Sequence, residues 1–163
     1  MAKNKEEKTN VMRVLEQKKI AYTAHTYPHE EGMAVDGVTV AKSMGFDPAI
    51  VFKTLVARGA SKQYYVFDVP VAENLDLKKA AKAVGEKSIE MIHQKELLPL
   101  TGYVHGGCSP VGMKKLFPTV FHETAENLET MIVSAGKIGY QVKLAPHDLA
   151  ALVRAKFADI IVE

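Results

Sequence analysis

The stretch AIVFKTLVA, residues 49–57, and the stretch QYYVFDV, residues 63–69, decide the fold. Both are rich in β-branched and aromatic residues, and Gly59 between them permits a tight reversal, so together they predict a β-hairpin. Side chains alternate between the two faces of a strand, and both faces of the first stretch are largely apolar. Such a strand is normally covered on both sides. We therefore expect a sheet with helices packed around it.

Lys53 interrupts this apolar strand, on the face that also carries Val51, Leu55 and Ala57. We expect its amine to lie in a pocket or at a pocket's mouth, where burial disfavours the charged form and a nearby anion favours it. One interpretation is a functional amine that meets an oxyanion or a phosphate. The other is an ion pair across the hairpin with Asp68, which the turn brings to about the same level. The residues alone leave both interpretations open.

The remaining segments alternate between helical and extended patterns, and Asn10 is the expected N-cap of the first helix. Hairpins interspersed with helices, rather than a strict strand and helix alternation, predict an α/β (α+β) fold in which helices flank a mixed sheet. Helices are expected at residues 10–20, 36–44, 75–84, 92–100 and from Pro146 onward, and strands at 21–27, 103–105, 119–122, 129–134, 140–145 and 157–162.

Length and composition favour a single domain over residues 1–163, with residues 1–9 flexible. No apolar run is long enough to span a membrane and no secretory signal is recognised, so we expect a cytoplasmic protein. A single cysteine, Cys108, excludes an internal disulfide and fits a reducing compartment. The 21 basic and 19 acidic residues give a net charge of +2, which indicates only a local and modest affinity for RNA.

Two loops are candidates for ligand contacts. The glycine-rich segment GYVHGGCSPVG, residues 102–112, lets the backbone approach a ligand and present N–H groups to it, although it can equally be a tight structural crossover. It is not a phosphate-binding Walker loop, because Met113 stands where that motif requires lysine. The turn VSAGKIG, residues 133–139, carries Ser134, whose hydroxyl can bond a substrate or its own backbone.

Two other chemistries are set aside. His105 and Cys108 are close enough in sequence for a thiol and imidazole pair, but a glycine-rich loop does not fix their orientation, and a small apolar cysteine is ordinary packing. His25 and His29 flank Pro28, which prevents the helical spacing of a zinc motif. We expect neither a metal nor a cofactor.

Five segments together resemble the YbaK/EbsC family of Cys-tRNA(Pro) deacylases, which are relatives of the prolyl-tRNA synthetase editing domain. They are VFKTLVA, LDLKKAAKAVG, TGYVHGGCSPVGMKK, IVSAGKIG and LVRAKFADI, and they occur in the family's order over nearly the whole chain. The resemblance implies one domain built on a curved, barrel-like mixed sheet flanked by helices, with an amino-acid pocket at the sheet.

The resemblance also implies roles for individual residues. The family's strand lysine falls on Lys53, and its loop from Gly106 to Pro110 would hold the terminal adenosine and the ester carbonyl through backbone groups. The implied catalytic residues are Lys53, Tyr27 and Ser134, and the implied substrate-binding residues are Gly106, Gly107, Pro110, Gly136 and Gln141.

The implied reaction is trans-editing of Cys-tRNA(Pro), and of Cys-tRNA(Cys) as a second substrate, in which the thiol of the attached cysteine attacks its own ester. The products would be a cyclic thiolactone and free tRNA. The partners would be aminoacylated tRNA(Pro) and, in a shared complex, prolyl-tRNA synthetase. Family members often carry aspartate where this chain has Gln141, which leaves two alternatives open: editing of another amino acid such as alanine, or a non-catalytic module that binds aminoacyl-tRNA or a synthetase.

Overall fold

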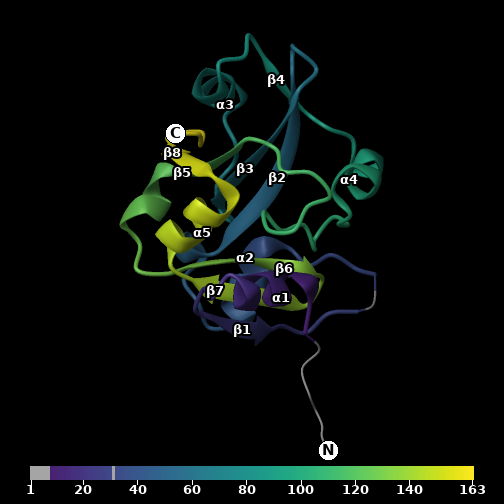
Figure 1. Ribbon diagram of the computed structural model, residues 1–163, viewed down its shortest axis with the longest axis vertical. Helices are drawn as coiled ribbons and strands as arrows, with labels where there is room; N and C mark the ends of the chain where they lie inside the picture. The colour runs from purple at the N-terminus through teal and green to yellow at the C-terminus, as the bar shows by residue number, and fades with distance from the viewer. Residues whose placement is uncertain (1–7, 31) are drawn as a thin grey trace, which may run out of the picture.

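The computed structural model describes residues 8–30 and 32–163, and its strands form two sheets (Figure 1). The larger sheet has the strand order β4-β2-β3-β5-β8, and the smaller has the order β1-β7-β6. The strands are β1 (Tyr22–Thr26), β2 (Phe52–Gly59), β3 (Tyr64–Pro70), β4 (Ile89–Met91), β5 (Thr119–His122), β6 (Met131–Lys137), β7 (Tyr140–Leu144) and β8 (Ala155–Ala158). The α-helices are α1 (Asn10–Gln17), α2 (Gly37–Ser43), α3 (Leu77–Val84), α4 (Gln94–Thr101) and α5 (Pro146–Val153), with 3-10 turns η1 (Pro48–Ile50) and η2 (Glu123–Asn127).

The larger sheet is mixed, as the sequence predicts. β2 pairs antiparallel with β3 and β4, whereas β3 with β5 and β5 with β8 are parallel. The expectation of one barrel-like sheet is wrong for the described strands, because they form no closed barrel and β1, β7 and β6 make a separate antiparallel sheet. The two sheets meet at a parallel bridge between Val51 and Ile132. In Figure 1 the smaller sheet lies with α1 and α2 at one end of the molecule, and α3 lies near the other end.

The predicted hairpin is confirmed, but its register separates Lys53 from Asp68. Lys53 stands opposite Val69, and Asp68 stands opposite Thr54. A difference of one residue in a strand places a side chain on the other face of the sheet. The proposed ion pair between Lys53 and Asp68 is therefore wrong, and Asp68 shares its face with Thr54.

Both faces of the hairpin are covered, as its two apolar faces predict. On the side of Phe67 and Val69, the small residues Ala80 and Ala81 of α3 pack against the sheet. On the side of Phe52 lies a core supplied by both sheets together with α1 and α5, and its fully buried members include Leu15, Phe121, Met131 and Leu149. Burial of these side chains removes a large apolar area from water, which is the main favourable term in folding.

Several local predictions need correction. The N-cap of α1 is Thr9 rather than Asn10, and its Oγ1 accepts from the N–H of Met12 at 3.2 Å. Thr9 is buried, in contrast to the flexible segment expected at residues 1–9. Residues 1–7 of that segment lie outside the described part of the chain. Residues 103–105 form no strand, because the glycine-rich segment after α4 is irregular. The sequence does not predict the short strand β4, which pairs with three residues of β2. Within the described ranges, no helix is long and apolar enough to cross a membrane.

Asp76 caps α3: its Oδ1 accepts from the N–H groups of Lys78 and Lys79 at 2.9 and 3.1 Å. Replacing Asp76 by Ala leaves these donors without their partner, so we expect the free energy of unfolding to fall by about 1 kcal/mol. Urea unfolding followed by circular dichroism measures this. Asp76→Asn keeps an acceptor and should lose clearly less; equal losses for the two variants would contradict the assignment.

Candidate functional site

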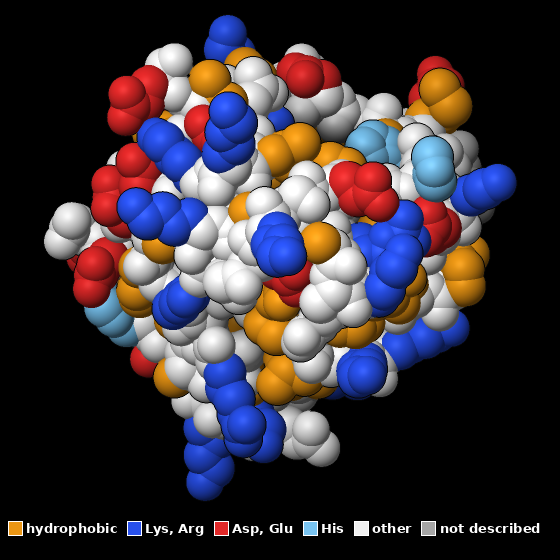
Figure 2. Space-filling view, turned by 90° about the horizontal axis from the view of Figure 1, so that it is seen from above, with side chains coloured by type: hydrophobic (Ala, Val, Ile, Leu, Met, Phe, Trp, Pro, Cys, Tyr) orange, Lys and Arg blue, Asp and Glu red, His pale blue; other side chains and the backbone are white. Residues whose placement is uncertain are grey.

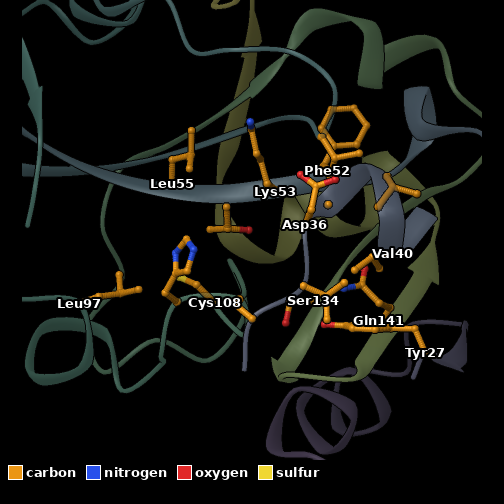
Figure 3. Close-up of a pocket in the computed structure, with 18 residues that line it drawn as sticks. Tyr27, Asp36, Val40, Phe52, Lys53, Leu55, Leu97, Cys108, Ser134 and Gln141 are labelled. Atoms are coloured by element: carbon orange, nitrogen blue, oxygen red, sulfur yellow. The ribbon is translucent and has the colours of Figure 1, made fainter. Parts of the chain in front are cut away.

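A cavity lies where the two sheets separate. Val51 is bridged to Ile132 of β6, and beyond this bridge β2 and β6 diverge, one joining each sheet. The space between them is a cavity of about 340 Å³ (Figure 3). Its walls come from residues 51–55, from the segment that leads into and forms α2, from the glycine-rich loop and from the smaller sheet. They include Tyr27, Ala34, Asp36, Val40, Lys53, Thr54, Leu55, Leu97, His105, Gly106, Cys108, Ser134 and Gln141.

The cavity follows the edge of β2. Successive side chains of a strand point to opposite faces, so a cavity that touches five residues in succession must run along the strand's edge. The N–H of Val71 donates to the carbonyl of Val51, whereas the carbonyl of Val56 accepts from the N–H of Ile92 on the other side. Main-chain groups alternate in this way along an antiparallel strand, so those of Thr54 point away from β3, toward the cavity.

Lys53 places a cation beside the cavity. Burial lowers the pKa of its amine below the usual value, and the nearby charges of Asp36 and Glu73 oppose that shift. No ion pair joins Lys53 to a carboxylate within residues 8–30 and 32–163. In Figure 3 the side chains of Lys53 and Leu55 leave β2 on one side, whereas Ser134 lies on the other side of the strand. The half-buried amine is thus available to a ligand at the rim and does not face Ser134.

Tyr27, Ser134 and Gln141 are brought together by the smaller sheet. Ser134 stands opposite Gln141 in the pairing of β6 with β7, and Tyr27 follows β1, in which His25 stands opposite Gln141. All three cavity residues are buried, and Ser134 Oγ accepts from the N–H of Gly136 at 3.1 Å.

Gln141 carries an unpaired acceptor at the cavity wall. Its side chain is only 7% exposed, and its Oε1 atom has no hydrogen-bond partner in the structure. Buried polar atoms are normally satisfied, because an unpaired one costs roughly 1–3 kcal/mol. An orphaned acceptor in a cavity wall is therefore suited to a ligand that brings a donor.

The glycine-rich loop contributes less than the resemblance implies. Gly106 lines the cavity at φ +89°, and a Cβ there would lie 2.7 Å from Cβ of Ala34, so only glycine allows this close approach. The N–H of Gly107 donates to the carbonyl of Val104 at 2.9 Å, so it is already used within the turn. Pro110 lines a different hollow.

Gly136 also lies outside the cavity wall. A Cβ on Gly136 would lie 2.9 Å from the ring of Tyr103 and 3.0 Å from Val11, and its φ is +90°. Its role is therefore to let the turn pack against these residues. Of the eight residues implied by the resemblance, Lys53, Tyr27, Ser134, Gly106 and Gln141 converge on the cavity.

A buried acid, Asp68, lies behind the cavity, and the sequence suggests for it only a role as a partner of Lys53. Asp68 is fully buried, its Oδ1 is 2.5 Å from Thr54 Oγ1, and its Oδ2 has no partner. Burial raises the pKa of the Asp68 carboxyl to about 7, against the opposing effect of the Thr54 hydrogen bond. The signal in the sequence was an acidic residue within an otherwise apolar strand, whose register only the structure settles.

Cys108 lines the cavity as a neutral thiol. Burial, aided by the charge of Asp68, raises its pKa to about 12. A nucleophilic cysteine requires a lowered pKa, so these surroundings argue against the thiol and imidazole alternative with His105. Across the described ranges, no group of three or more His, Cys, Asp and Glu residues is placed to hold a metal ion.

The surface carries mixed charge. Lys and Arg side chains are distributed over the face in Figure 2, with acidic and apolar side chains between them. Some lysines are already engaged: Lys79 contacts Asp159 and Glu163 at 3.0 and 3.2 Å.

The fold agrees with the comparisons to known proteins. Residues 29–152 match the model of the aminoacyl-tRNA editing domain. This match spans most of the chain, and the protein therefore belongs to the aminoacyl-tRNA editing domain family, within the YbaK/EbsC group that the five segments resemble.

One relative is similar over nearly its entire length. It is a candidate Cys-tRNA(Pro)/Cys-tRNA(Cys) deacylase, EbsC, from Enterococcus faecalis, 45% identical over 161 residues that cover 98% of each chain. A crystal structure of a candidate trans-editing enzyme for prolyl-tRNA synthetase is 25% identical, with a TM-score of 0.79 and coverage of 94% of this chain and 95% of the other. A hypothetical protein at 18% identity, with a TM-score of 0.82 over 93% and 99% of the chains, shares the fold.

The raised pKa of Asp68 predicts a pH dependence of stability. The folded protein retains a proton between about pH 4 and pH 7 that the unfolded chain releases, so this group's contribution is present at low pH and is lost as pH rises through 7. Chemical denaturation at several pH values should show Asp68→Asn gaining stability relative to the parent over this range, by on the order of a few kcal/mol. A constant difference between the two proteins would contradict the raised pKa.

Proposed function

We propose that this protein is a trans-editing deacylase that releases cysteine from mischarged Cys-tRNA(Pro), and from Cys-tRNA(Cys). The observation that carries the proposal is the cavity at the fork of the two sheets. Among the described residues, an orphaned buried acceptor lies in its wall, and an amine without an ion pair lies beside it. Its volume of about 340 Å³ suits an aminoacyl group and part of a nucleoside. The name of the Enterococcus relative supports the choice of substrate.

Gln141 is proposed to bind the amino group of the attached amino acid. Its Oε1 accepts a hydrogen bond without supplying charge, and the buried, unpaired state of that atom in the free protein leaves it ready for a donor. Ser134, directly opposite Gln141, and Tyr27 would enclose the same group. The neutral acceptor orients the amino group of the substrate. It favours the protonated form of that group less strongly than a carboxylate would.

Lys53 is proposed to meet the ribose and phosphate end of the substrate. A cation at the rim stabilises a phosphate or the charge that develops on the 3′ oxygen as the ester breaks. The same anion would favour the charged form of the amine and oppose the effect of burial on its pKa. Gly106 lies in the cavity wall, where its backbone can contact the ester.

The chemistry proposed for this site uses the substrate's own nucleophile. The cysteine sulfur attacks its own ester carbonyl and forms an S–C bond, while the bond from carbon to the 3′ oxygen breaks. The thiol proton ends on the 3′ oxygen, so the products are a cyclic thiolactone and free tRNA. Holding thiol and ester in a reactive arrangement can lower the barrier by roughly 7 to 11 kcal/mol in well-aligned cases. The protein then needs to orient the ester and exclude water, and the neutral Cys108 thiol takes no part in bond making.

Replacing Lys53 by Ala removes the rim cation, and we expect single-turnover release of cysteine from Cys-tRNA(Pro) to slow by roughly 10²-fold. Lys156→Ala, which removes an exposed lysine from β8 of the same sheet, is the matched control and should retain the parent rate. Parent-like release by Lys53→Ala would refute the role of the amine.

The same assay decides among the alternatives when it includes Ala-tRNA(Pro) and correctly charged Pro-tRNA(Pro). A thiol-assisted enzyme releases cysteine and spares both. Faster release of alanine than of cysteine would identify an alanine editor, and tight binding without any release would identify a non-catalytic module.

Cys108→Ser tests whether the protein's own thiol matters. Serine has nearly the same shape, and a thiol with a pKa of about 12 is un-ionised near neutral pH, so we expect the rate of cysteine release to stay within about threefold of the parent. Modification with iodoacetamide followed by mass spectrometry should likewise label Cys108 slowly. Loss of activity in Cys108→Ser together with rapid labelling would support a thiol enzyme instead.

A further inference from the structure

Asp68 is a buried acid that the function proposed above does not use. It lies on β3 between Thr54 of β2 and Phe121 of β5, and the neighbours on its own strand and face are Val66 and Pro70. These surroundings are apolar apart from Thr54. An ionisable group at such a position is costly to the fold unless it is neutral or satisfied, and one of its two oxygens has no partner.

Thr54 connects this acid to the cavity. Its hydroxyl is 2.5 Å from Asp68 Oδ1, and Thr54 is also part of the cavity wall. When Asp68 is ionised it can only accept, so the hydroxyl proton of Thr54 points to the carboxylate and the lone pairs of Oγ1 remain for a donor in the cavity. Thr54 Oγ1 therefore presents an acceptor to a ligand, and the Asp68 carboxylate behind it can take up one proton.

We propose that Thr54 and Asp68 form a proton relay for the thiol of the attached cysteine, an inference that rests on the proposed deacylase function. The thiol gives its proton to Thr54 Oγ1 while the original hydroxyl proton of Thr54 passes to Asp68 Oδ1. The sulfur electron pair forms the S–C bond, and the carbon to 3′ oxygen bond breaks. The proton returns from Asp68 through Thr54 to the 3′ oxygen, so the protein ends in its starting state. Thr54 touches the substrate, and Asp68 is a positioning residue.

The surroundings of Asp68 suit this task. A base acts best when its pKa lies near the working pH, and apolar burial brings the pKa of this carboxyl close to neutrality. The loop packed over this face carries Tyr103, His105 and Cys108. Burial raises the pKa values of Tyr103 and Cys108 to about 12, so both are un-ionised near pH 7. Lys53 occupies the opposite face of β2, and β5 presents Phe121, which carries no charge.

The test is the pH profile of single-turnover cysteine release between pH 5.5 and 9. In the parent protein the rate should rise through about pH 7 as Asp68 ionises. Asp68→Asn and Thr54→Val should both lose this step, with rates at pH 7 reduced by roughly 10²-fold. At pH 9 the deficit should shrink, because the substrate thiol then ionises without a base. Thr54→Ser keeps the hydroxyl and should keep the step, and Glu90→Gln, at an exposed carboxylate on β4, is the control for loss of a negative charge.

A folding or binding defect is separated by a second measurement. The affinity for a non-hydrolysable analogue, in which cysteine is joined to the 3′ end by an amide, should be similar in the parent, Asp68→Asn and Thr54→Val. Weakened analogue binding that accounts for the whole rate loss at every pH would overturn the relay, as would a parent-like profile in Asp68→Asn. If the parent releases cysteine and Lys53→Ala does not, a parent-like pH profile in Asp68→Asn refutes the relay alone. If the parent releases no cysteine at any pH, the deacylase function itself is refuted.

Discussion

The hydrogen-bonding edge of β2 is the constraint on which the site depends. Every buried main-chain N–H and C=O needs a partner, and along this edge the partners come from two different strands. β6 bridges the edge at Val51, and β4 pairs with it only from Ala57 onward. β6 and β4 belong to different sheets and do not meet. The part of the β2 edge between them therefore borders the cavity. The cavity is a consequence of how the chain divides its strands between two sheets, and the substrate is expected to approach an edge that the fold leaves uncovered.

The polar groups at this edge depart from the rules that govern the rest of the core. Gln141 Oε1 and Asp68 Oδ2 are the two buried side-chain atoms without a partner in the described structure, and they lie in the wall of the cavity and directly behind it. Elsewhere, buried polar side chains such as Thr101 and Thr119 bond to nearby carbonyls. Local rules of this kind are commonly broken at functional sites, where a ligand supplies the missing partner.

The sequence predicted the position of residues well where strand alternation decides it, and less well in loops. Lys53 could be recognised because an amine in an apolar strand needs an explanation, and it does lie at the cavity. Gly107 and Gly136 were implied by a motif, yet the structure uses one in a turn and the other for packing. Glycine in a motif identifies a close approach of the backbone without saying what approaches, since its freedom of φ serves turns, packing and ligands equally.

The sequence by itself determined the hairpin, the helices near residues 36–44 and 75–84, the apolar character of both sheet faces and the family. These features depend on neighbouring residues, through side-chain periodicity and the hydrogen-bonding needs of helix ends. The tertiary structure alone decided that the strands split into two sheets, that Asp68 faces Thr54 rather than Lys53, and that Gln141 reaches the same cavity from a different sheet. Such contacts join residues far apart in the chain, and a shift of one residue in register reverses them, so no local pattern fixes them.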